Sequence, residues 1–229
     1  MTIGIIGAMD EEVELLKESI TNKNEQTVAN CLFVTGLLGG KEVVLLKSGI
    51  GKVNAAMATT ILHERFHPTY IINTGSAGGF AEELEIGDIV VSSHVTHHDV
   101  DVTAFNYAYG QVPGMPAMFA ADSKLVSIAL NVANSLSVTA KEGIIATADT
   151  FMSDLNHVKR IKEIFPSMIA AEMEAAAVAQ VSYQYNTPFV VIRALSDIAG
   201  KESSVSFDAF IDKAAKNAAT LIMKMIKEL

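Results

Sequence analysis

Apolar and polar positions alternate along the chain in two patterns. Short apolar runs bounded by Gly or Asp are followed by longer stretches whose apolar residues recur at helical spacing. This alternation predicts an α/β fold, in which helices cover a sheet. The expected strands lie within residues 3–9, 69–80, 87–102, 141–151 and 188–200, with a hairpin over 30–48 that turns at Gly39-Gly40. The expected helices cover 11–19, 122–135, 155–164 and 206–229, and another follows the glycine-rich turn at 49–51 and ends at Phe66.

Polar residues gather at the carboxyl ends of these apolar runs or in the turns just past them. In open α/β sheets, ligands bind at this edge, so the pattern predicts a site there without naming a reaction. The residues concerned are Asp10-Glu11-Glu12, Ser76, Asp149, Glu174 and Ser196-Asp197.

Composition narrows the class of protein. With 229 residues, of which 50% are hydrophobic and 19% charged, the chain is expected to form one domain and to bury further apolar surface in a homo-oligomer. The formal net charge is −9 and basic residues do not cluster, which argues against nucleic-acid binding.

The same sequence indicates a cytoplasmic protein. Cys31 is the only cysteine, so no intrachain disulfide and no thiolate metal cluster is expected. The first residues lack the basic segment of a signal peptide, and no apolar run is long enough to span a membrane.

Several short motifs have competing interpretations. The segment "NTGSAGG" is either a tight turn or a backbone cradle for a ligand, and "SGIGK" fits neither phosphate-binding motif. The segment "THHDVD" lacks a recognisable metal-ligand spacing, so no metal site is predicted. Asp197 comes immediately after a buried strand that contains Arg193 four residues earlier, and a buried salt bridge between them is the plain structural interpretation.

Carboxylates are the clearest chemical signal. Glu172 and Glu174 stand two residues apart in the apolar stretch "IAAEMEAAAVAQ", where an unpaired buried charge is costly. Glu12, Glu174 and Asp197 each lie near a strand end, and carboxylates around one cleft suit cleavage of a glycosidic bond. Sequence spacing does not show that the three converge.

Seven segments together resemble one family. In chain order they are "IGIIGAMDEEVELL", "SGIGKVNAA", "INTGSAGG", "HHDVDVTAF", "ATADTF", "AAEMEAAAVAQ" and "VVIRALSDIAG". As a set they resemble the bacterial 5'-methylthioadenosine/S-adenosylhomocysteine nucleosidases of the nucleoside phosphorylase and hydrolase superfamily, over essentially the whole chain. The resemblance implies a three-layer αβα sandwich with a central mixed β-sheet, a homodimer, and no cofactor or metal. It also implies hydrolysis of the N-glycosidic bond, which releases adenine and 5-methylthioribose or S-ribosylhomocysteine.

The resemblance also implies a role for each matching residue. Glu12 would be the base that activates water, and Asp197 the acid that protonates adenine at N7. Glu174 would hold the ribose hydroxyls beside Met173, while Ser76 and Arg193 surround the water and the hydroxyls. Further residues match positions around the substrate, among them Gly78 and Ser196 in the site, Phe151 and Met152 at adenine, Met9, Ile50 and Phe207 at the alkylthio group, and Val102, Phe105 and Pro113 contributed by the other subunit.

The resemblance leaves some points open. Met152 stands where an Ile or Val is expected, which puts the shape of the adenine pocket in doubt. Glu172 receives no chemical role and is expected to be a structural partner for a backbone or basic group. The stretch from Ala175 is expected to be a helix that follows a short strand, with Met173-Glu174 at the junction.

Rival activities remain to be weighed. A purine nucleoside phosphorylase needs cationic groups where this chain has Asp10-Glu11-Glu12, which would repel phosphate. A nucleosidase for futalosine, 5'-deoxyadenosine or another adenosine derivative would differ only around the 5' substituent. A non-enzymatic nucleoside-binding protein would be expected to lack one of the three carboxylates.

Overall fold

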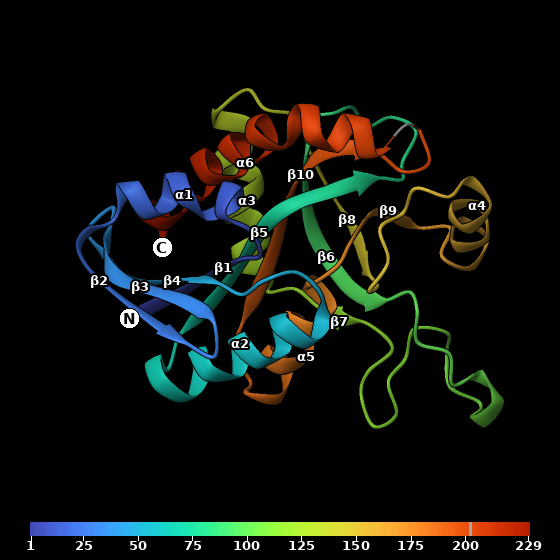
Figure 1. Ribbon diagram of the computed structural model, residues 1–229, viewed down its shortest axis with the longest axis horizontal. Helices are drawn as coiled ribbons and strands as arrows, with labels where there is room; N and C mark the ends of the chain where they lie inside the picture. Colours follow the sequence, from blue (N-terminus) through green and yellow to red (C-terminus); the bar gives the residue numbers. More distant parts are fainter. Residues whose placement is uncertain (202) are drawn as a thin grey trace.

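The computed structural model describes residues 1–201 and 203–229, and a sheet runs between two sets of helices (Figure 1). Its amino-terminal elements are β1 (Thr2–Gly7), α1 (Asp10–Ser19), β2 (Thr21–Val28), β3 (Cys31–Leu38), β4 (Lys41–Lys47), α2 (Lys52–Phe66), β5 (Tyr70–Gly79) and β6 (Ile89–His97). After a 3-10 turn at Thr103–Phe105 come β7 (Phe119–Ala120), α3 (Ser123–Ser135), β8 (Ala140–Thr147), α4 (Leu155–Ile164), β9 (Met168–Glu172), α5 (Ala175–Gln184), β10 (Phe189–Ile198) and α6 (Ser203–Glu228). The predicted α/β class and mixed central sheet are confirmed.

The sheet follows the order β10-β6-β8-β9-β5-β1-β4-β3-β2 and curls back on itself. β1 runs parallel to both β4 and β5, and β5 runs parallel to β10. β6 is antiparallel to β10, while β9 is parallel to β8 and antiparallel to β5. Because β10 pairs with both β5 and β6, the strands β5, β9, β8, β6 and β10 close into a ring. Because β1, β5 and β10 run parallel, their carboxyl ends lie at the same edge of the sheet.

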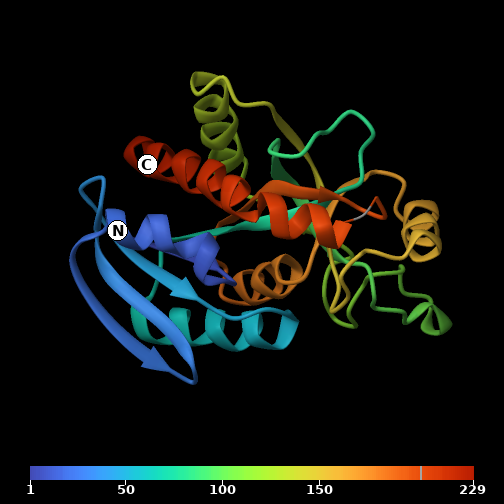
Figure 2. The same cartoon turned by 45° about the horizontal axis from the view of Figure 1, so that its top comes forward.

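Alternating side chains along each strand divide the core between the two faces of the sheet. On one face, Ile3 and Ile5 of β1 and Ile192 of β10 belong to a cluster with α1, α3 and α6. On the other face, Ile6 and Val191 pack with α2 and α5. Figures 1 and 2 show these two sets of helices on opposite sides of the sheet.

Helix α6 is the longest helix and is amphipathic. Its inward positions, among them Ala218, Ile222 and Met225, are fully or almost fully buried, while lysines occupy much of its outer side. In the described part of the chain, no helix is long and apolar enough to cross a membrane.

Three sequence predictions about element bounds were wrong. The edge strand β2 was missed because its residues are mostly polar and exposed, so they carry no apolar alternation. The strand expected over 87–102 ends at His97, and the chain then turns away at Asp99, whose carboxylate binds Lys52 Nζ at 2.6 Å. The last helix begins at Ser203 rather than at residue 206.

Candidate active site

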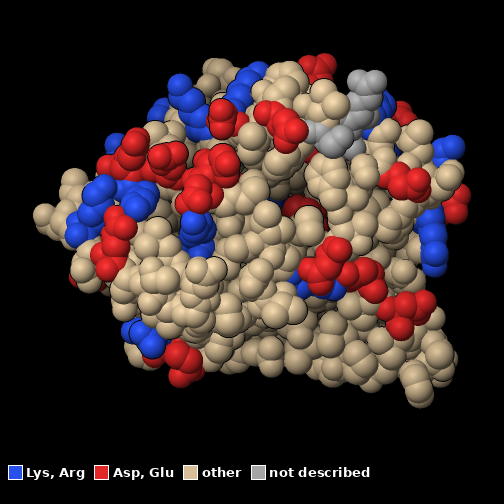
Figure 3. Space-filling view, in the orientation of Figure 1, with Lys and Arg blue, Asp and Glu red and all other residues tan. Residues whose placement is uncertain are grey.

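A cavity of about 360 Å³ opens where the carboxyl ends of β1, β5 and β10 meet the junction of β9 and α5. Acidic atoms are visible at the bottom of a hollow near the middle of Figure 3. The predicted site residues that line the cavity are Met9, Glu12, Ile50, Ser76, Gly78, Phe151, Met173, Glu174, Ser196, Asp197 and Phe207. The three carboxylates that the sequence left apart are thus brought to one cavity.

Glu12 lies in the first turn of α1, where its carboxylate is buried and fixed by four donors. Oε2 accepts hydrogen bonds from the backbone N–H groups of Ala8 (2.8 Å) and Met9 (3.2 Å). Oε1 accepts from Ser76, through its N–H at 2.9 Å and its hydroxyl at 3.2 Å. A Cβ at Gly75 would come within 2.7 Å of Oε1, so only glycine lets β5 approach this closely. The carboxylate therefore has one orientation at the cavity wall.

Asp197 is placed by an irregularity in β10. The register of β10 against β5 shifts between Leu195 and Asp197, and such bulges re-aim side chains. One carboxylate oxygen of Asp197 accepts from the Ser196 hydroxyl at 2.9 Å, and the other faces Gly78. Only 2% of the residue is exposed, and this burial raises the pKa of Asp197 to about 6. A buried carboxyl of this kind is suited to act as a proton donor.

Glu174 ends the turn between β9 and α5 and reaches across to the start of α2. Its Oε1 accepts from the Gly51 N–H at 2.9 Å. Burial and, after it, the nearby Glu172 carboxylate raise the pKa of Glu174 to about 8. This shift favours the neutral form of Glu174 at neutral pH, and positive charge close to the carboxyl would favour the ionised form.

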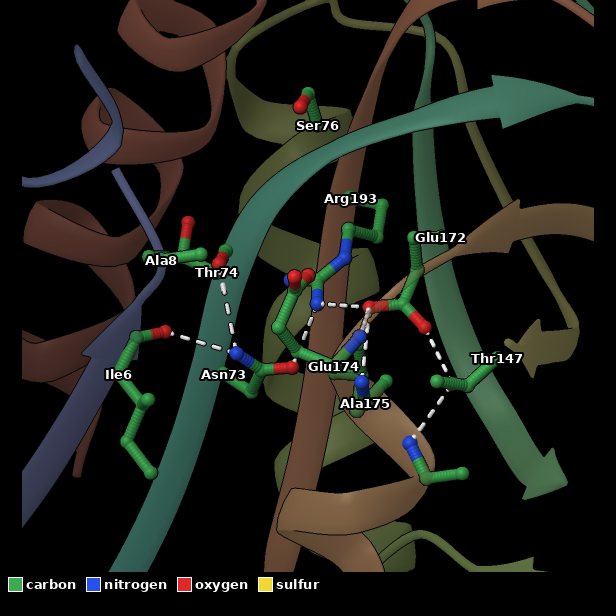
Figure 4. Close-up of polar contacts among 12 residues, drawn as sticks. Ile6, Ala8, Asn73, Thr74, Ser76, Thr147, Glu172, Glu174, Ala175 and Arg193 are labelled. Atoms are coloured by element: carbon green, nitrogen blue, oxygen red, sulfur yellow. Dashed lines mark hydrogen bonds and ion pairs between the residues drawn. The ribbon is translucent and has the colours of Figure 1, made fainter. Parts of the chain in front are cut away.

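Arg193 lies behind the cavity and pairs with Glu172 rather than with Asp197, so the alternative of an Arg193–Asp197 salt bridge was wrong. Its Nη2 donates to Glu172 Oε2 at 2.5 Å and to Asn73 Oδ1 at 2.8 Å (Figure 4). Glu172 accepts from a backbone N–H as well as from this basic group, as the sequence predicted. Glu172 ends β9 and lines the cavity, whereas Arg193 and Asp197 lie four residues apart on β10.

Two aromatic rings form part of the apolar lining of the cavity. Phe151 and Phe207 meet edge to face, with ring centroids 5.9 Å apart, and 41% of Phe151 is exposed. Met152 does not line the main cavity; it lies at a small adjoining cavity of about 30 Å³ with Gly78 and Asp197. An edge and a face of aromatic rings next to a carboxyl suit a flat heteroaromatic ligand.

Other predicted residues lie outside the cavity. Val102, Phe105 and Pro113 belong to the segment between β6 and β7 and do not line it. In "THHDVD", His97 Nε2 lies 3.0 Å from Gln180 Oε1, and Asp99 is paired with Lys52.

The sequence matches a known protein family over almost its whole length. Residues 2–227 match the family model described as the phosphorylase superfamily. The chain belongs to the phosphorylase superfamily. It is 61% identical to the 5'-methylthioadenosine/S-adenosylhomocysteine nucleosidase of Oceanobacillus iheyensis, over the full length of both chains.

Solved structures of this superfamily agree with that relationship. The 5'-methylthioadenosine/S-adenosylhomocysteine nucleosidase of Neisseria meningitidis, in complex with methylthio-immucillin-A, superposes with a TM-score of 0.98 and 44% identity, covering 100% of this chain and 99% of that one. The futalosine hydrolase of Helicobacter pylori superposes with a TM-score of 0.95 and 33% identity, covering 100% and 98%. The family resemblance predicted from the motifs is confirmed.

Sequence reasoning missed two buried polar residues that contact Arg193 and Glu172, namely Asn73 and Thr147. Asn73 joins Arg193 to the Ile6 carbonyl, and Thr147 donates to Glu172 and accepts from the Ala176 N–H. Both interrupt otherwise apolar strands, in "IINTG" and "IIATADT". A buried polar residue inside an apolar strand is the signal that could have found them.

Proposed function

We propose that this chain hydrolyses the N-glycosidic bond of 5'-methylthioadenosine and S-adenosylhomocysteine. The observation that carries the proposal is the convergence of Glu12, Glu174 and Asp197 on one cavity with an aromatic wall. Two carboxyl groups on either side of a glycosidic bond provide an acid for the leaving group and a base for water. The two relatives named as nucleosidases for these substrates support this choice.

The acid in this proposal is Asp197. Adenine leaves poorly as an anion, so a proton supplied during bond cleavage lowers the barrier. Burial raises the pKa of Asp197 to about 6. At a given pH, a larger fraction of Asp197 is therefore protonated than of an exposed Asp. Ser196, whose hydroxyl donates to the carboxylate, orients the group.

Glu12 and Glu174 act on the other side of the scissile bond. Glu12, held by donors from Ala8, Met9 and Ser76, takes a proton from the attacking water. Glu174 accepts hydrogen bonds from the ribose hydroxyls. Positive charge that develops on the ribose favours the ionised form of Glu174, so this contact strengthens in the transition state.

Water is the proposed nucleophile, rather than phosphate. Asp10 and Glu11 are exposed outside the cavity, and Asp10 pairs with Lys47, but Glu12, Glu172 and Glu174 all line the cavity. A phosphate dianion would meet like charges there, whereas a neutral water meets a base.

Adenine release tests the proposal directly. The purified protein is expected to release adenine from both thioether nucleosides at rates that do not change when phosphate is added. Futalosine and 5'-deoxyadenosine, offered in parallel, are expected to be cleaved with lower kcat/KM. Release that depends on phosphate, with 5-methylthioribose-1-phosphate as the product from methylthioadenosine, would show a phosphorylase, and preference for futalosine would show the other nucleosidase.

A second copy of the chain is proposed to complete the alkylthio end of the cavity. Ile50, Val53 and Met57 lie along one side of the start of α2 and are 50%, 78% and 37% exposed, and Phe105 is 75% exposed. The lower part of the face in Figure 3, over α2, α5 and the segment between β6 and β7, carries few charged side chains. An apolar surface of this kind fits a homodimer in which Val102, Phe105 and Pro113 of each subunit reach the other's cavity.

Subunit mixing tests this shared site. Phe105→Ala should raise KM for methylthioadenosine, and Glu12→Gln should abolish turnover, when each forms a homodimer. In a mixed dimer one cavity would combine an intact Glu12 with an intact Phe105. Co-expressed and purified mixtures should therefore regain roughly a quarter of wild-type activity with wild-type KM. No recovery in dimers shown to be mixed would contradict the shared site.

A further inference from the structure

The guanidinium of Arg193 is buried but bonded on one side only. Arg193 is 1% exposed, and Nη2 makes both of its hydrogen bonds, to Glu172 and Asn73 (Figure 4). Within the described residues, Nε and Nη1 have no hydrogen-bond partner. A buried donor without a partner has lost its hydrogen bonds to water and gained none, so two such donors are expected only where something else binds them.

The free Nη1 of Arg193 lies near the Glu12 carboxylate. A Cβ placed on Gly75 would lie 2.7 Å from Glu12 Oε1 and 3.1 Å from Arg193 Nη1, so both groups lie against the same side of Gly75. Burial lowers the pKa of Arg193, but the Glu172, Glu174 and Glu12 carboxylates together raise it by more, so the guanidinium remains cationic. A water or a sugar hydroxyl between Glu12 and Arg193 would satisfy both the acceptor and the donors.

Both carboxylate oxygens of Glu172 accept hydrogen bonds from groups around this site. Its Oε2 accepts from Arg193 Nη2 and from the backbone N–H groups of Glu174 (3.0 Å) and Ala175 (2.8 Å). Its Oε1 accepts from the Thr147 hydroxyl. One carboxylate thus ties the guanidinium to the backbone that carries the Glu174 side chain.

We propose that Glu172 is a positioning residue for the reaction, which acts through Arg193. It holds the guanidinium so that Nε and Nη1 donate hydrogen bonds to the attacking water and to a ribose hydroxyl beside Glu12. The same contacts fix the position of the guanidinium relative to Glu174. This inference rests on the proposed function, because it assigns the positioning of that same site. It gives a chemical reason for the buried ion pair, which by itself is weak evidence for stability.

Replacement of Glu172 by glutamine tests the role. The amide oxygen can still accept from Arg193 and from both N–H groups, and the amide nitrogen can donate to Thr147 Oγ1, so the fold should be kept. The neutral amide binds the guanidinium less strongly than a carboxylate does. We expect Glu172→Gln to lower kcat for adenine release by about tenfold or more while KM changes by less than about threefold. Glu163→Gln removes a charge from an exposed position on α4 and should leave both constants unchanged.

A second pair of variants guards against a folding defect. Thr147→Val removes the hydroxyl that donates to Glu172, whereas Thr147→Ser keeps it. The valine variant should lose kcat in the same direction as Glu172→Gln, and the serine variant should recover it. In an Arg193→Gln background, the added Glu172→Gln should cause little further loss of kcat, since both act through one group.

Two results would overturn the inference. One is a Glu172→Gln enzyme with wild-type kcat and only a lower Tm, which is the pattern of a structural ion pair. The other is full additivity of the Glu172 and Arg193 losses. Failure of the proposed function is distinguishable, because the unmodified protein would then release no adenine from either nucleoside in the absence of phosphate.

Discussion

Replacement of Asp197 by asparagine is expected to lower kcat for adenine release by about 100- to 10,000-fold, the range that a positioned general acid contributes. Asparagine fills nearly the same volume and can still meet the Ser196 hydroxyl, so the fold and the binding of substrate should survive. The asparagine amide is not acidic enough to transfer a proton to departing adenine. The measurement is the steady-state release of adenine, together with the Tm of the variant.

The leaving group provides the sharpest control for this prediction. In a nitrophenyl glycoside of 5-methylthioribose, the leaving group departs as a stable nitrophenolate, so cleavage needs no general acid. The Asp197→Asn variant should therefore cleave this substrate almost as fast as the unmodified enzyme does. Asp212→Asn, on the exposed side of α6, should change neither reaction. Equal losses with both leaving groups would contradict an acid role for Asp197.

The pH dependence of the unmodified enzyme follows from the same carboxyl. The protonated form is active, and the pKa of Asp197 is raised to about 6 by burial, so the proton is lost as pH rises through that region. For methylthioadenosine, kcat/KM should therefore fall above about pH 6, whereas this limb should be absent for the nitrophenyl glycoside.

The central elements of the fold were predictable because their signals are local. The apolar runs of β1, β5 and β10 are buried on both faces, and each ends in Gly or a polar residue, which marks both the strand and its carboxyl end. These ends also located Glu12, Ser76 and Asp197. The edge strand β2 has no buried face to impose a pattern, so nothing local distinguished it from a loop.

The contacts inside the site were not predictable from spacing. Glu172 contacts Arg193 because β9 runs antiparallel to β5 and closes the ring of strands. The hydrogen bond between Arg193 and Glu172 joins residues that are 21 positions apart in the sequence. The bulge in β10 that re-aims Asp197 likewise depends on the register with β5. Long-range pairing of this kind is set by the whole sheet and leaves no mark within the strand's own sequence.

The two glutamates of "IAAEMEAAAVAQ" illustrate the difference. The strand β9 ends at Glu172, and α5 begins at Ala175, so the two side chains leave the backbone on either side of a sharp change in conformation. Glu172 turns back to Arg193 and the start of α5, whereas Glu174 reaches Gly51 across the cavity. Their separation in sequence predicted a buried charge, and the strand-to-helix junction decided which of the two pairs with Arg193 and which reaches Gly51.

Replacement of Glu12 by glutamine is expected to remove at least about 100-fold of kcat and to destabilise the fold as well. The amide has no basic oxygen to take a proton from water. Its NH₂ group must also face either the N–H groups of Ala8 and Met9 or the N–H of Ser76, which are all donors. Each donor left unpaired costs about 1–3 kcal/mol, and each kcal/mol lowers the Tm of a chain of this length by roughly 2–4 °C.

The adjacent residue supplies the matched control for Glu12. Glu11 lies in the same first turn of α1 but is exposed, so Glu11→Gln removes one charge from the same helix end and should keep both kcat and Tm. A Glu12→Gln enzyme that lost only Tm while its kcat for adenine release stayed near that of Glu11→Gln would rule out Glu12 as the base. Loss of kcat in Glu12→Gln for both methylthioadenosine and the nitrophenyl glycoside is the expected result, because water must be activated whichever group departs. That pattern differs from the selective loss expected for Asp197→Asn, so the two variants together separate the base from the acid.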